Sequence, residues 1–285
     1  MWVLIRLLAL ASGAMVLLLA AEQGTWLLET ADRALEVVGT RPLPRGAGAP
    51  TGWVALSGLA AGLLGAAARP SRRLLGQLAT LLHELGHTLV AAALGARPSG
   101  IVLRHDASGH ATARWVGRPG PVRRLSLATT AFVGLPAPAV GAAAGAGLLQ
   151  VAGPRAVLWS LALAGGVVAV LARSLWSLVM AIGFIALAIL GLSEVAEPWA
   201  AGAVVGLLTA VALHAGLDAA RRLTRPIPAG DDAHAVRRRV RLPARLVQVL
   251  QVACTLVAAA WTVWLLLPWP LLHQTAMIRC AAMCS

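Results

Sequence analysis

A series of apolar segments runs through this chain, each about 16 residues long or longer, and segments of this length can cross most or all of a membrane. They cover about residues 2–21, 52–68, 74–94, 125–152, 156–171, 175–192, 199–217 and 246–268. Charged residues make up only 12% of the chain, whereas soluble domains have roughly 25%. The pattern predicts an all-α polytopic membrane protein with about six to eight transmembrane helices.

The formal net charge of +13 comes from arginines that gather in the connections between apolar segments. This distribution follows the positive-inside rule and places the connections at 69–73 and 221–245 in the cytoplasm. It argues against nucleic acid as a partner and for the lipid bilayer. We expect a multi-pass protein of a bacterial cell membrane.

Three units are predicted along the chain. Residues 1–50 hold a first span and an extracytoplasmic loop, residues 51–268 form a membrane-embedded core, and residues 269–285 form a tail. The first apolar segment is either a retained span or a cleaved signal peptide, and we favour the span because the rest of the chain is itself apolar.

The connection from 97 to 124 is predicted to contain a β-hairpin. Short strand-like runs at 101–103 and 111–113 flank an Asp106-Ala-Ser-Gly109 turn. The segment at 125–152 contains Pro136 and Pro138, so we expect a broken or re-entrant helix there rather than a simple span.

Residues 83–87 read His-Glu-Leu-Gly-His. On a helix, His83 and His87 project from the same face, so both ring nitrogens can reach one Zn²⁺ ion. Glu84 lies beside that face and can activate water as a general base. Ionisable groups deep in an apolar segment are costly and usually functional. We predict a zinc site with His83 and His87 as ligands and Glu84 as the catalytic residue; the alternative is a buried polar cluster that ties helices together without metal.

A catalytic zinc ion usually has three protein ligands, so a third is expected from elsewhere in the chain. Asp218 is the first choice, because it ends an apolar segment on the side that we assign to the cytoplasm. His214 shares its helix face and could support Asp218 or bind the metal itself. Asp232, in the arginine-rich connection that follows, is a further candidate for the third ligand.

These residues together resemble the site-2 protease-like intramembrane zinc metallopeptidases, and within them the smaller bacterial branch that lacks a PDZ domain. The resemblance covers about residues 70–265: the motif is followed by a hairpin-like loop, a Gly134-Leu-Pro136 segment, a span ending in Leu217-Asp218, and an Asp232-Ala233 loop before the last span. It implies zinc bound by the two histidines and hydrolysis by water that Glu84 activates. The aspartate ligand of that family usually lies in a Leu-Asp-Gly sequence, whereas Ala219 follows Asp218 here.

The sequence therefore predicts a membrane-embedded zinc metalloendopeptidase that hydrolyses peptide bonds of membrane-associated proteins or peptides. A hypothesis from another functional class stays open: the chain could be a non-catalytic membrane protein, or a transporter, that uses the His/Glu cluster structurally or as an ion site. The transporter is disfavoured because the sequence shows no convincing internal repeat.

Overall fold

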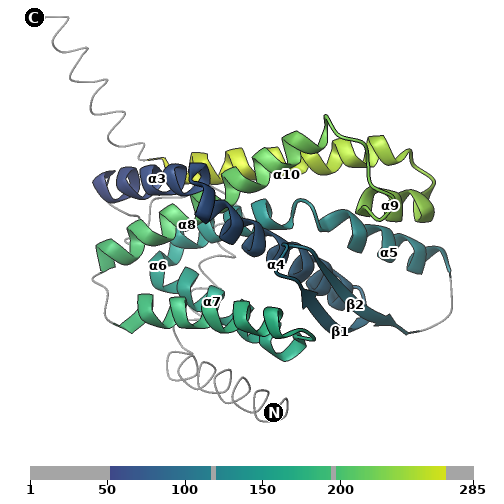
Figure 1. Ribbon diagram of the computed structural model, residues 1–285, viewed down its shortest axis with the longest axis horizontal. Helices are drawn as coiled ribbons and strands as arrows, with labels where there is room; N and C mark the ends of the chain where they lie inside the picture. Colours follow the sequence, from purple (N-terminus) through teal and green to yellow (C-terminus); the bar gives the residue numbers. More distant parts are fainter. Residues whose placement is uncertain (1–51, 117–119, 194–196, 268–285) are drawn as a thin grey trace, which may run out of the picture.

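The structure is a computed structural model that describes residues 52–116, 120–193 and 197–267, which form eight helices and one two-stranded sheet (Figure 1). The elements are α3 (Gly52–Ala67), α4 (Arg69–Ala93), β1 (Ala96–Leu103), β2 (Gly109–Trp115), α5 (Pro121–Val133), α6 (Ala137–Leu171), α7 (Leu175–Ser193), α8 (Glu197–Arg222), α9 (Asp232–Val240) and α10 (Ala244–Leu266). The mostly helical architecture and the hairpin after the motif helix are both confirmed. The predicted units 1–50 and 269–285 lie outside the described residues.

Four of the described helices are long and apolar enough to cross a membrane, namely α6, α7, α8 and α10. The shorter α3 is also apolar, over Val54–Ala67. The motif helix α4 is not among the four, because its polar motif residues lower its hydropathy. This set is consistent with the predicted polytopic fold, and the first predicted segment, 2–21, lies outside the described part of the chain.

The apolar run at 125–152 is divided between two helices, as its prolines predicted. Helix α5 ends at Val133, and α6 begins at Ala137 after a short turn that contains Pro136. At 13 residues, α5 extends about 20 Å and is too short to cross a hydrocarbon core of about 30 Å. Helix α6 is itself kinked at Gly153, whose φ of 79° is readily adopted only by glycine, with Pro154 directly after it.

The helices pack closely through small residues and a continuous apolar core. Gly58 and Gly62 of α3 face Gly202 and Gly206 of α8 so closely that a Cβ on Gly58 would lie 2.6 Å from the Gly202 carbonyl oxygen. Small residues of this kind let helix backbones approach each other in membrane proteins. The α3–α8 pair and helices α6, α7 and α10 therefore form the scaffold against which α4 is fixed.

The β-hairpin folds back along α4 and is fixed to it by side-chain hydrogen bonds. Gln77 donates to the carbonyl oxygens of Arg104 (3.1 Å) and His105 (2.8 Å), and Thr80 donates to that of Ala107 (2.8 Å). On the other side, the Ser177 hydroxyl accepts a hydrogen bond from the Leu103 amide (2.8 Å). The hairpin turn is thus held beside the α4 turn that precedes the motif, while α5 and α9 gather at the same end of the molecule (Figure 1).

Candidate metal centre

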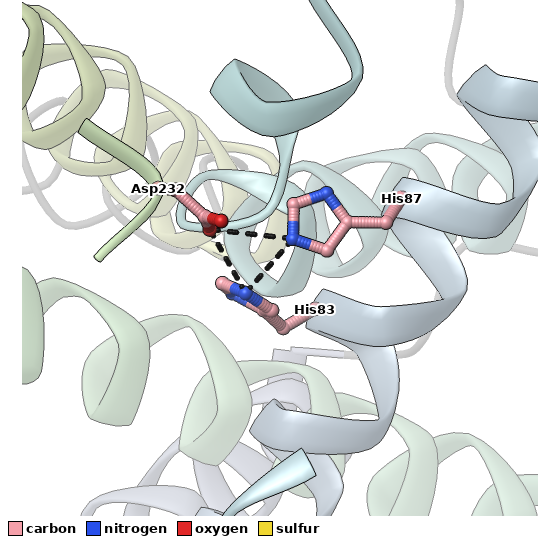
Figure 2. A group of neighbouring side chains, drawn as sticks. All are labelled: His83, His87 and Asp232. Atoms are coloured by element: carbon pink, nitrogen blue, oxygen red, sulfur yellow. Dashed lines mark hydrogen bonds and ion pairs between the residues drawn. The ribbon is translucent and has the colours of Figure 1, made fainter. Parts of the chain in front are cut away.

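Helix α4 presents the two motif histidines on one face, as their spacing predicted. The two imidazole rings lie nearly perpendicular, with an interplanar angle of 89° and a centroid separation of 4.6 Å. Their Nε2 atoms point toward each other and are 3.1 Å apart (Figure 2). Two ring nitrogens are thereby directed at one point in space.

The third member of the group is Asp232, the first residue of α9, which reaches the histidines from the opposite side (Figure 2). Its Oδ2 atom lies 3.1 Å from Nε2 of His83 and 3.3 Å from Nε2 of His87. Among the described residues, His83, His87 and Asp232 form the group able to hold a metal ion.

The geometry of these three atoms fits a zinc-sized ion. Tetrahedral ligands with bonds of about 2.0–2.1 Å lie about 3.3 Å apart, close to all three separations observed here. Two imidazoles and one carboxylate are also a donor set typical of catalytic zinc sites. The side chains of His83, His87 and Asp232 are 23%, 14% and 25% exposed, so the group is largely shielded.

Residues around the group fix the orientation of the rings. Nδ1 of His87 lies 2.6 Å from the Thr130 carbonyl oxygen of α5, a contact that orients the ring so that Nε2 faces the metal position. Gly134, at the end of α5, lies against both rings: a Cβ there would be 2.5 Å from Cε1 and Nε2 of His87 and 2.6 Å from Cε1 of His83. The absence of a side chain at this residue makes room for the two imidazoles.

Asp232 is held in its charged form by the histidines. Burial alone would raise the pKa of its carboxyl group, but the hydrogen bonds with His83 and His87 outweigh burial and hold the pKa below its ordinary value. Asp232 is therefore a carboxylate at neutral pH, which is the form that binds a metal.

Glu84 is buried, with 4% of its surface exposed. Together with His83 it lines a cavity of about 410 Å³. The remaining walls of the cavity come from the hairpin turn, the start of α6 and one face of α8. A substrate group in this cavity would meet both a metal ligand and a candidate general base.

Asp218, the first choice for the third ligand, is not part of the metal-binding group. Its Oδ2 atom instead accepts a hydrogen bond from Nε of Arg222, four residues further along α8, at 3.0 Å. His214 and Asp218 both line the cavity, opposite the motif helix. The structure places Asp232, and not Asp218, against the two histidines.

The local sequence contains a signal for this outcome. Asp218 and Arg222 have the i, i+4 spacing of a helical ion pair, which gives Asp218 a partner before any tertiary contact is considered. Asp231 and Asp232 have the position of a helix start, with an N-cap aspartate before a short amphipathic helix. A residue at a helix start can present its carboxylate to a neighbouring element.

The fold and the site define a polytopic membrane protein with a group of side chains that can hold a metal ion, of the kind found in metallopeptidases. The model of the Peptidase M50B-like family matches residues 56–262, and the chain belongs to this family. The family match agrees with the resemblance to site-2 protease-like peptidases and covers the motif helix, the hairpin and all four candidate spans up to Thr262. No match was found among curated proteins, and none among solved structures.

Proposed function

We propose that this protein is a zinc-dependent intramembrane endopeptidase of the site-2 protease type, which cleaves peptide bonds of membrane-associated proteins or peptides. The observation that carries the proposal is the triangle formed by His83, His87 and Asp232, at the edge of a cavity that Glu84 lines. His83, His87 and Asp232 hold the ion. Glu84 follows His83 directly in α4 and lines the same cavity, which supports its assignment as the general base.

When bound, zinc supplies Lewis acidity toward the scissile carbonyl and lowers the pKa of a water molecule to about 7. Glu84 accepts the proton of the attacking water and delivers it to the leaving amine. The burial of Glu84 excludes bulk water from the proton transfer.

The cavity accounts for the expected class of substrate. It lies among helices of a membrane protein, so a peptide must reach it in a locally unwound form, because a helix hides its carbonyl groups in its own hydrogen bonds. Helix-weakening residues near the cleavage point of a transmembrane substrate would favour this step.

The test is cleavage of a panel of single-span peptides by purified protein in zinc-containing lipid vesicles, with Glu84→Gln as the matched control. The wild type should cleave at least some of the peptides, and Glu84→Gln should keep its metal while turnover falls by about 10²–10⁴-fold. A transporter would instead move zinc or protons across the vesicle membrane without cleavage. Equal turnover in the two proteins would contradict the assignment of Glu84 as the general base. Bound iron in place of zinc would contradict the assignment of zinc as the metal ion.

A further inference from the structure

Three aspartates lie close to the candidate metal centre: Asp218 near the end of α8, and Asp231 and Asp232 at the start of α9. Only Asp232 contacts the two histidines. The other two carboxylates both bind a single guanidinium, that of Arg222.

The Arg222 side chain uses two different nitrogens for its two partners. Its Nε atom donates to Oδ2 of Asp218 at 3.0 Å, and its Nη1 atom donates to Oδ2 of Asp231 at 3.1 Å. The Asp231 side chain is 11% exposed, so this second ion pair is mostly shielded from water on the aspartate side. The fixed fork of the guanidinium suits this double contact, which a lysine ammonium cannot reproduce with the same geometry.

Asp231 connects Arg222 to the metal-binding residue. It is the N-cap of α9: its Oδ1 atom accepts a hydrogen bond from the Ala233 amide at 2.9 Å, while its Oδ2 atom binds Arg222. Asp232 is the next residue, so the orientation of this first turn sets the direction of the Asp232 carboxylate. With nine residues, α9 is too short to be stable on its own and depends on such contacts.

The base of the Arg222 side chain is also fixed. The Arg222 carbonyl oxygen accepts a hydrogen bond from Nε2 of Gln248 on α10 at 3.2 Å. Arg245, also on α10, donates to Oε1 of Gln248 at 2.6 Å and to the Leu223 carbonyl oxygen. The end of α8 is therefore tied to α10, and Arg222 extends from a rigid position.

We propose that Arg222 is a positioning residue for the metal centre. Its guanidinium engages Asp218 and Asp231, fixes the first turn of α9 and leaves Asp232 as the carboxylate that faces His83 and His87. The positive charge of Arg222 also offsets the negative charges of Asp218 and Asp231, which would otherwise repel the carboxylate of Asp232. The ion pair with Arg222 also keeps Asp218 from acting as a competing metal ligand in the cavity. This inference rests on the proposed function, because it assumes that the group binds zinc.

The experiment measures the zinc affinity of the full-length protein in detergent by competition with a chelator of known affinity. Arg222→Gln should weaken binding by about 10- to 100-fold, the usual cost of losing a group that orients a metal ligand. Arg222→Lys should recover part of the loss, because it keeps the charge without the fork. Arg225→Gln removes the same charge from an exposed side chain three residues further on, and its affinity should stay within about twofold of the wild type.

Circular dichroism of the metal-free proteins shows whether Arg222→Gln folds. If it does not fold, a second variant tests the same ion pair. Asp231→Asn keeps an acceptor for the helix cap but removes the ion pair, and it should weaken zinc binding in the same way. The double variant should bind no more weakly than the weaker of the two single variants, because both remove one interaction. Wild-type protein without zinc affinity would overturn the proposed function and this inference with it. Equal affinity in the wild type, Arg222→Gln and Asp231→Asn would overturn the inference alone.

Discussion

Replacing Gly134 by alanine should strongly weaken metal binding without adding any polar group. The new Cβ would lie 2.5 Å from Cε1 and Nε2 of His87 and 2.6 Å from Cε1 of His83. Non-bonded carbon atoms prefer about 3.5–4.0 Å, so the rings or the backbone at residue 134 must move by about 1 Å. The ring of His87 is also held by the Thr130 carbonyl oxygen, which limits its freedom to move away.

A displacement of about 1 Å is large on the scale of metal coordination, where ligand distances hold to within about 0.2 Å. We therefore expect the zinc affinity of Gly134→Ala to fall at least about 100-fold, equivalent to about 2.8 kcal/mol. The assay is chelator competition on purified protein, with Gly141→Ala as the matched control. Gly141 lies in α6, where an added Cβ meets nothing within 4 Å. Equal zinc affinity in Gly134→Ala and Gly141→Ala would refute the ring-packing argument.

Two further outcomes follow from the same geometry. Zinc at 100 times its dissociation constant should raise the free energy of unfolding of the wild type by about 2.7 kcal/mol, measured by chemical denaturation, and should leave His83→Ala unchanged. Gly86→Ala should destabilise the protein by about 1–3 kcal/mol, because its Cβ would lie 2.4 Å from that of Ala137 where α4 crosses the start of α6. Gly147→Ala, in open space on α6, is the control for Gly86→Ala, and similar unfolding curves for the two would argue against a close contact between α4 and α6.

Features that depend on local chemistry could be predicted from the sequence. The hairpin turn follows from Asp106, whose Oδ1 atom accepts hydrogen bonds from the Ser108 amide (3.0 Å) and hydroxyl (2.7 Å). The position of both motif histidines on one face of α4 follows from their helical spacing alone. The interruption near Pro136 follows from the effect of proline on a helix, although the sequence did not show that α5 would be as short as 13 residues.

The third side chain of the metal-binding group depends on tertiary packing and could not be derived in the same way. Asp218 lies at the end of the apolar α8 segment, whereas Asp232 lies in the arginine-rich connection after it, so the apolar pattern favoured Asp218. The difference arises because α9 packs against α5 and α10 through Ala233 and Val236, which directs Asp232 toward α4. The pairing of Asp218 with Arg222 was the local feature that could have favoured Asp232.

The central claim is that His83, His87 and Asp232 together bind one zinc ion. Elemental analysis of purified protein tests it most directly, in the wild type and in the Asp232→Ala and Asp218→Ala variants. The account predicts about one zinc per chain in the wild type and in Asp218→Ala, and loss of zinc in Asp232→Ala. Zinc retained in Asp232→Ala but lost in Asp218→Ala would contradict the site described here, and folded wild-type protein without zinc would contradict the metallopeptidase assignment itself.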